Sequence, residues 1–164
     1  MEIQYLKNLE KEIENKNKFS STHFTEGISE EAIEKVENEL NVKFPKAYKE
    51  FLILAGEGVG FGFGNAIDHA FDWAVEDFQQ NMQELLDEFK VNLQKKHWAF
   101  TSFNSESFDF FYLDGNDDPI VYLFDPYTTR EVKDVSLPKG VTKSYDKFSD
   151  YVNACIEGHK KGML

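Results

Sequence analysis

Residues 40–64 read LNVKFPKAYKEFLILAGEGVGFGFG and contain the end of one helix, the start of another and a run of alternating glycines. Pro45 suits the first turn of a helix, because proline has no N–H to lose there and its φ is already helical. An apolar face follows at helical spacing, formed by Tyr48, Phe51, Leu52 and Ala55. Gly56 is expected to end this helix in the left-handed conformation. The stretch contains no recognisable catalytic motif and is typical of a scaffold for docking.

The glycine run repeats with a period of two: Gly58, Gly60, Gly62 and Gly64 alternate with Val59, Phe61 and Phe63. This alternation predicts an extended segment with one side free of side chains, which another backbone or ring can approach closely. Phe63 and Asn65 stand where the third glycine of a G-x-G-x-x-G loop would fall. The run also follows a helix rather than a strand, so nucleotide binding is not favoured.

Residues 40–56 resemble the signature of the SUKH superfamily, which includes bacterial toxin-immunity proteins and fungal cell-wall regulators. The matching positions are Leu40, Phe44, Pro45, Tyr48, Lys49, Phe51, Leu52 and Gly56. Asn41 replaces the usual glycine, and Phe44 replaces the usual leucine. The first exchange is mild because asparagine tolerates the left-handed conformation better than other non-glycine residues. Ala55 stands where the signature often has asparagine.

Two helices are expected before this stretch. Residues 2–16 place Leu6, Leu9 and Ile13 on one stripe, and residues 18–28 are a polar connection. Ser29 is a good N-cap for the second helix, with Glu30 and Glu31 in its first turn. The stripe predicted to be buried on that helix consists of Ile33, Val36 and Leu40.

Residues 66–97 contain an acidic block without Lys or Arg before Lys90. Its carboxylates are Asp68, Asp72, Glu76, Asp77, Glu84, Asp87 and Glu88. Apolar residues at helical spacing predict a helix from about Trp73 to Leu93. A solvated helix face is the simpler interpretation of any single carboxylate in this block.

The C-terminal half favours strands, predicted at residues 98–103, 108–113 and 120–125, with a weaker one at 131–135. Residues 114–119 between them are expected to form a turn or loop. A final helix is expected to begin at Ser144, which would cap it. This order resembles the SUKH pattern, in which a Pro-Val-Tyr-like strand ends in Asp; here those residues are Pro119, Val121, Tyr122 and Asp125.

The predicted fold is α+β, with helices packed on a twisted, mostly antiparallel sheet as in SUKH proteins. The 164 residues suit a single domain with a real core. The resemblance spans residues 28–156, so residues 1–27 are expected to be an added N-terminal helical extension.

The net charge of −12 disfavours binding to nucleic-acid phosphates and to acidic membrane surfaces, whereas a basic protein would be attracted. Many proteins are acidic simply for solubility. Cys155 is the one cysteine, which excludes an internal disulfide framework and a cysteine-based zinc site. The N-terminus lacks the pattern of a signal peptide, and no segment has transmembrane length, so a cytoplasmic location is expected.

Other chemistry has weaker support in the sequence. Asp114, Asn116, Asp118 and Asp125 follow an EF-hand-like count, but Pro119 occupies the position that requires glycine. The four histidines are scattered, and no nucleophile elbow accompanies Asp68, His69 and Asp72. Cys155 lies on an apolar helical stripe and is expected to be inert. No catalytic residue, metal or cofactor is therefore predicted.

The resemblance implies a binding function: an immunity protein that neutralises a cognate secreted toxin domain, with a nuclease or other basic toxin favoured. Charge and aromatic clustering place the partner-binding residues at Phe61, Phe63, Asp68, Asp72, Trp73, Glu76 and Asp77. One alternative is an intracellular scaffold or regulatory module that binds an endogenous protein. Another is a small hydrolase with an unrecognised site, which loss of turnover on mutation of His69 would favour. The sequence leaves the toxin's identity and the oligomeric state open.

Overall fold

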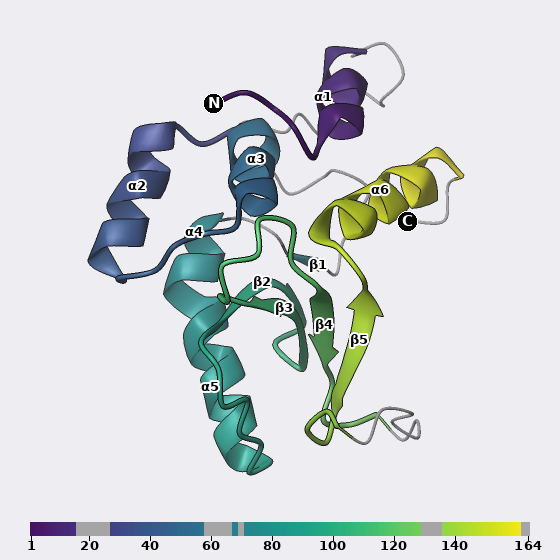
Figure 1. Ribbon diagram of the computed structural model, residues 1–164. Coiled ribbons are helices and arrows are strands. Elements are labelled where there is room, and N and C mark those ends of the chain that lie inside the picture. The colour runs from purple at the N-terminus through teal and green to yellow at the C-terminus, as the bar shows by residue number, and fades with distance from the viewer. Residues whose placement is uncertain (16–26, 58–66, 69–70, 129–135, 162–164) are drawn as a thin grey trace.

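The computed structural model describes residues 1–15, 27–57, 67–68, 71–128 and 136–161, and its elements are shown in Figure 1. Three helices come first, α1 (Lys7–Glu14), α2 (Glu30–Glu39) and α3 (Lys46–Ala55). A helical stretch follows, made of α4 (Phe71–Trp73), the π-helical turn η2 (Ala74–Phe78) and α5 (Gln79–Glu88). The last helix is α6 (Phe148–Lys160).

Five strands form one antiparallel sheet in the order β1-β2-β3-β4-β5. They are β1 (Ile67–Asp68), β2 (His97–Phe103), β3 (Ser107–Tyr112), β4 (Val121–Phe124) and β5 (Val141–Tyr145). Each strand pairs with its neighbours in the chain, so the sheet is a meander. The predicted α+β class and the three main predicted strands are confirmed.

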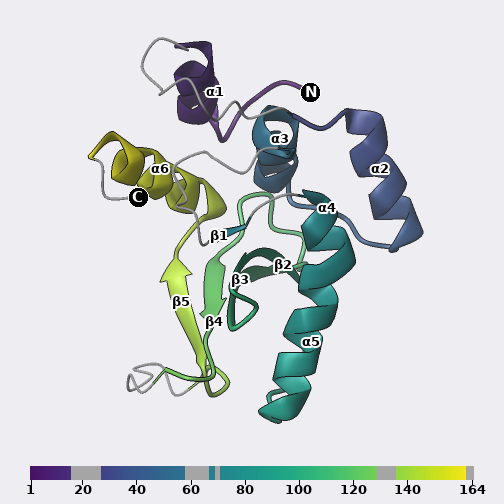
Figure 2. The ribbon, with the colours of Figure 1, turned by 180° about the vertical axis from the view of Figure 1, so that it is seen from behind.

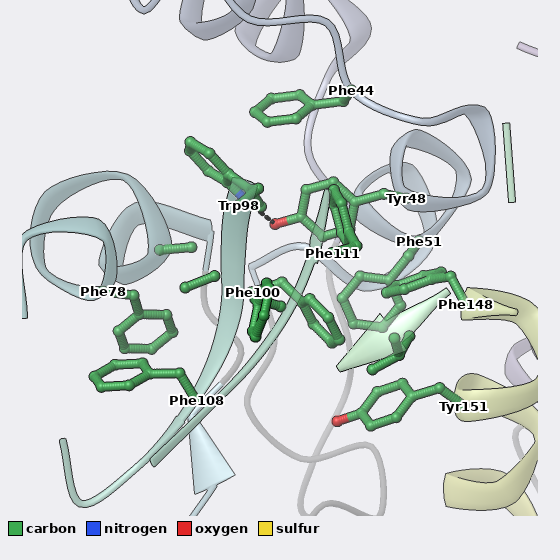
Figure 3. Close-up of a cluster of buried hydrophobic side chains, with 14 of the residues drawn as sticks. Phe44, Tyr48, Phe51, Phe78, Trp98, Phe100, Phe108, Phe111, Phe148 and Tyr151 are labelled. Carbon is green, nitrogen blue, oxygen red and sulfur yellow. Dashed lines mark hydrogen bonds between the residues drawn. The ribbon is translucent and has the colours of Figure 1, made fainter. Parts of the chain in front are cut away.

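Helices cover both faces of the sheet. Successive residues of a strand point to opposite faces, so one strand can contact both helical layers. Phe108 of β3 packs against Phe78 of η2 on one face. Phe111 of the same strand packs against Tyr48 of α3 and Phe148 of α6 on the other face. Figure 3 shows these two groups of rings on opposite sides of the strands. The sheet is therefore the middle layer between α4–η2–α5 and the pair α3 and α6.

Tyr48 lies at the centre of the second layer. Its ring is fully buried and contacts the rings of Phe44, Phe51, Phe100, Phe111 and Phe148. Its hydroxyl oxygen accepts a 3.1 Å hydrogen bond from Nε1 of the buried Trp98 (Figure 3). Pro45 takes the N-cap position, one residue before α3 rather than in its first turn as predicted. Helix α3 thus supplies the aromatic core that joins it to α6 and the sheet.

The N-terminal segment is built into this core. Ile3, Leu6 and Leu9 are buried, and α1 contacts both α3 and α6, beside which it lies in Figures 1 and 2. The carboxylate of Glu50 in α3 accepts hydrogen bonds from the backbone N–H groups of residues 4–6. These donors precede the first turn of α1, where helix N–H groups have no partner within the helix. The helix predicted over residues 2–16 is present but shorter.

The loop between β3 and β4 joins two helix N-termini. The Asp117 carbonyl accepts a 2.8 Å hydrogen bond from the Ala47 N–H at the start of α3. The Asp118 carboxylate accepts bonds from the Ser149 N–H and hydroxyl at the start of α6, at 2.9 and 2.7 Å. Asp114 and Asn116 accept from backbone N–H groups two residues further along the loop. The Asp and Asn side chains of this loop therefore serve turns and caps.

The structure corrects several local predictions. Ser144 lies in β5, and α6 begins at Phe148, because strand pairing with β4 takes the residues that the cap would need. The helix predicted to end at Leu93 ends at Glu88. Leu40 is 42% exposed, whereas Glu37 takes a buried place on α2. Ser29 caps α2 as predicted, since its side chain accepts from the Ala32 N–H.

Gly56 ends α3 in a right-handed conformation, with φ at −70°, rather than in the predicted left-handed one. Close packing is the reason for glycine here, because a Cβ would lie 2.6 Å from the Leu52 carbonyl oxygen and 2.7 Å from Ile28 Cδ1. Asn41 has the positive φ, at 49°, consistent with its tolerance for that region. The glycine run at 58–64 and the weaker strand at 131–135 lie outside the described residues.

Candidate functional site

The helical stretch of α4, η2 and α5 has one buried face and one acidic face. The buried residues are Phe71, Ala74, Phe78, Met82, Leu85 and Leu86. The exposed carboxylates are Asp72, Glu76, Asp77, Glu84, Asp87 and Glu88, here called the acidic face. Residues 71–88 include no Lys or Arg, and none of the six carboxylates forms an ion pair with a described residue. The acidic face therefore presents uncompensated negative charge to solvent.

Gln79 fixes how this stretch sits on the sheet. Its Nε2 donates to the Ala74 carbonyl at 2.8 Å and to the Ala99 carbonyl at 2.7 Å, and its Oε1 accepts from the Ala99 N–H at 3.1 Å. The register of β2 shifts between Ala99 and Thr101, next to these bonds. The Gln79 side chain thus links the end of the π-helical turn to the register shift in β2. The acidic face is directed away from the sheet.

Trp73 stands at the start of this surface and is 54% exposed. Large aromatic residues are usually buried, so an exposed tryptophan among carboxylates is unusual. Trp73 forms one wall of a groove of about 650 Å³ between α2, the end of α3 and α4. The other residues that line the groove are Ile28, Ala32, Lys35, Val36, Glu39, Gly56, Glu57, Phe71 and Asp72. We call this hollow the α2–α4 groove.

The predicted partner-binding residues fall into three groups. Asp72, Trp73, Glu76 and Asp77 are all exposed and lie within two turns at the start of the helical stretch. Asp68 lies in β1, whose backbone pairs with Ser102 of β2, and its side chain is outside the description. Phe61 and Phe63 lie outside the described residues. The first four therefore share one surface, and the role of all seven remains a prediction.

The sequence profile of the SMI1 / KNR4 family (SUKH-1) matches residues 27–154. The chain belongs to the SMI1 / KNR4 family (SUKH-1). The resemblance drawn from residues 40–56 is therefore confirmed. SUKH proteins include both toxin-immunity proteins and cell-wall regulators, and they are generally non-catalytic. Comparison with curated proteins finds no significant match.

The SUKH signature residues have structural roles in this chain. The buried Glu37 carboxylate accepts a 2.6 Å hydrogen bond from the Phe44 N–H, and Lys49 Nζ lies 3.6 Å from it. Phe44 packs its ring against Tyr48, Phe71 and Trp98. The signature thus closes the α2–α3 connection onto the core.

Two groups whose pKa values are raised by burial lie in the other layer, Asp109 on β3 and Cys155 on α6. Burial raises the pKa of Asp109 to about 6, opposed by a 3.2 Å hydrogen bond from the Thr101 hydroxyl. Burial also raises the pKa of the Cys155 thiol to about 12, so the thiolate is scarce at neutral pH. Among the described residues, no three His, Cys, Asp or Glu side chains gather as a metal site requires.

Sequence reasoning identified the acidic face but missed the groove beside it. The groove depends on Val36, which was predicted to be buried and is only partly covered, and on Glu57 and Asp72 converging from distant positions. Within the described ranges, no helix is long and apolar enough to cross a membrane.

Proposed function

We propose that this protein is a non-enzymatic immunity protein that binds and neutralises a cognate secreted bacterial toxin domain with a basic surface. Membership of the SMI1 / KNR4 family supports a binding role, because the family includes immunity proteins and is generally non-catalytic. The observation that carries the choice of a basic partner is the acidic face, whose six carboxylates form no ion pair with described residues.

Electrostatics explains how such a face would act. Uncompensated charge steers an oppositely charged partner and raises the association rate more than the final affinity. Fast association suits an inhibitor that must reach a toxin before the toxin reaches its target. The chain's net charge of −12 acts in the same direction. Charge of this sign repels nucleic acid and anionic membranes, so a protein is the proposed partner.

The affinity would come from aromatic anchors within the charged surface. Exposed tryptophan is among the residues that most often dominate binding energy at interfaces. Trp73 lies next to Asp72, so an apolar anchor and a charged contact adjoin in the chain. A standard interface buries about 1,200–2,000 Å² in total, more than the first turns of one helix provide. Phe61, Phe63 and Asp68 are the proposed additional contacts.

The proposal includes no catalytic step, metal or cofactor, and it places the protein in the cytoplasm, where it would intercept a toxin that enters the cell. Inhibition would be steric, by covering the surface with which the toxin engages its substrate. His69, on which the hydrolase alternative is tested, lies outside the described residues.

Co-expression tests the proposal. The C-terminal domain of the nearest encoded secreted toxin would be produced in cells with and without this protein, and binding would then be measured with purified components. Rescue of growth and tight one-to-one binding are expected. Continued killing without binding would reject immunity, and co-purification of an endogenous protein would then favour the regulatory alternative.

A further inference from the structure

The α2–α4 groove combines apolar walls with an acidic rim. Ile28, Val36, Phe71 and Trp73 supply the apolar surface, while Glu57 and Asp72 stand at its edge. Neither of these two carboxylates forms an ion pair with a described residue. The rim also contains Lys35, whose Nζ lies 3.8 Å from Oε1 of Glu39 on the same helix. Glu39 therefore partly neutralises the positive charge of Lys35. The groove therefore offers apolar contact and unbalanced negative charge together.

The size of the groove suits the side chains of a short peptide segment. Its volume of about 650 Å³ lies within the range of about 300–1,000 Å³ that is typical of ligand pockets. Elements distant in the sequence build it, namely α2 along its length with Ile28 before it, the residues after α3 and the start of α4. Gly56 is one of the lining residues, and a Cβ at this position would lie 2.7 Å from Ile28 Cδ1.

We propose that the α2–α4 groove anchors an arginine side chain, flanked by apolar residues, from a basic protein partner. This inference rests on the proposed function for the identity of the partner, but the groove chemistry can be tested without the toxin. The planar guanidinium stacks on a tryptophan face and pairs with carboxylates through two parallel hydrogen bonds, and it is more weakly hydrated than an ammonium group. Arginine therefore fits Trp73 and Asp72 better than lysine.

Charge argues against the other occupants of such a groove. A second copy of this chain would bring another net charge of −12 to the same surface, and the two copies would repel. A nucleic acid would place phosphates against Glu57 and Asp72, which is unfavourable. A basic segment with apolar neighbours is complementary to both the walls and the rim.

The test uses the full chain and the tripeptide acetyl-Leu-Arg-Leu-amide, with the counterparts that carry lysine or glutamate at the central position. Trp73 is the exposed reporter, because Trp98 is only 2% exposed. Titration is followed by tryptophan emission and by the amide NMR signals of residues lining the groove. We expect saturable binding of the arginine peptide, weaker binding of the lysine peptide and none of the glutamate peptide.

Two substitutions on α2 separate groove binding from general attraction. Val36→Arg places a long cationic side chain in the groove, whereas Leu40→Arg makes the same charge change at an exposed position outside its lining. Val36→Arg is expected to abolish peptide binding, and Leu40→Arg is expected to preserve it. Trp73→Ala should weaken binding by about 2- to 30-fold, the range for one cation–π contact.

Absence of saturable binding to the wild-type chain would overturn the proposal, as would equal binding by Val36→Arg and Leu40→Arg. If Val36→Arg fails to fold, titration of Trp73→Ala followed by NMR tests the proposal instead. An affinity of Trp73→Ala equal to that of wild type would also overturn the proposal. Peptide binding without toxin binding would leave the groove in place and reject immunity. If Val36→Arg and Leu40→Arg weaken toxin binding equally, immunity would stand and a role for the groove in toxin binding would be rejected.

Discussion

The carboxylate of Glu50 accepts a 2.7 Å hydrogen bond from the backbone N–H of Tyr5, across 45 residues of sequence. Glu50 lies within the range matched by the SMI1 / KNR4 family, whereas Tyr5 precedes it. The same carboxylate also accepts from the N–H groups of Gln4 and Leu6. A fully buried residue of the family core thus holds the segment that leads into α1.

Glu50→Gln is expected to destabilise the protein, because the new amide can no longer accept three bonds and turns N–H groups toward N–H donors. Leaving a buried donor unpaired costs about 1–3 kcal/mol of unfolding free energy. Urea denaturation would measure the change. Glu84→Gln on the exposed side of α5 is the matched control, with an expected change within about 0.5 kcal/mol. Equal midpoints for the two variants would show that Glu50 does not anchor the N-terminal segment.

Tyr48→Phe tests the centre of the aromatic core. The substitution keeps the ring contacts but removes the oxygen that accepts from Trp98 Nε1. The buried indole N–H is then unsatisfied, at a cost of about 1–3 kcal/mol. Thermal unfolding would report the loss as a lower melting temperature. Tyr127→Phe provides the control, because Tyr127 is 56% exposed and keeps its ring contact with Phe89. A wild-type melting temperature for Tyr48→Phe would argue against the bond.

Asp109 makes stability depend on pH in a definite direction. Burial raises its pKa from 3.8 to about 6, so the folded state favours the protonated carboxyl. The contribution of the protonated carboxyl to the free energy of unfolding is complete below pH 3.8. It is lost as pH rises through 6, because ionisation of Asp109 in the folded state is unfavourable. The groups around it, Tyr145, Tyr151 and Cys155, have raised pKa values and do not titrate in that window.

Asp109→Asn removes this titration while keeping an acceptor for the Thr101 hydroxyl. The unfolding free energy of the variant minus that of wild type should increase as pH rises from 4 to 7, by on the order of 2 kcal/mol in total. Urea denaturation at a series of pH values would measure the difference between the two proteins. A difference that stays constant across this range would mean that Asp109 ionises normally in the folded protein.

The local patterns that predicted structure well were those decided by neighbouring residues. Alternating aromatic residues predicted β2 and β3, and Ser29 was identified as the cap of α2 because its partner, Ala32, is three residues away. The exposed carboxylates at Asp72 and Glu76 were also predicted, since a helix without cations must place its charge in solvent.

Features decided by distant residues could not be predicted in this way. Glu37 and Glu50 resemble ordinary solvated helix residues, and partners outside their own helices explain their burial: backbone N–H groups for both, and the Lys49 ammonium group for Glu37. Ser144 has the chemistry of a cap, but the α6 N-terminus is capped by Asp118, which is 31 residues before Ser149. The α2–α4 groove likewise depends on how α2 and α4 meet.

Reversal of charge on the acidic face provides a test of partner recognition. Replacement of Asp72, Glu76 and Asp77 by lysine should slow association with a basic toxin domain, and the effect should be largest at low ionic strength, where screening is weakest. The matched control replaces Glu2, Glu34 and Glu106 by lysine, which makes the same change in net charge at exposed positions outside the acidic face.

The decisive measurement is the association rate constant with the cognate toxin domain, followed by stopped flow over a series of salt concentrations. We predict that the acidic-face variant associates more slowly than the control variant at low salt, and that the two rates converge as salt increases. Equal rates for the two variants at every salt concentration would contradict recognition of a basic partner by this face.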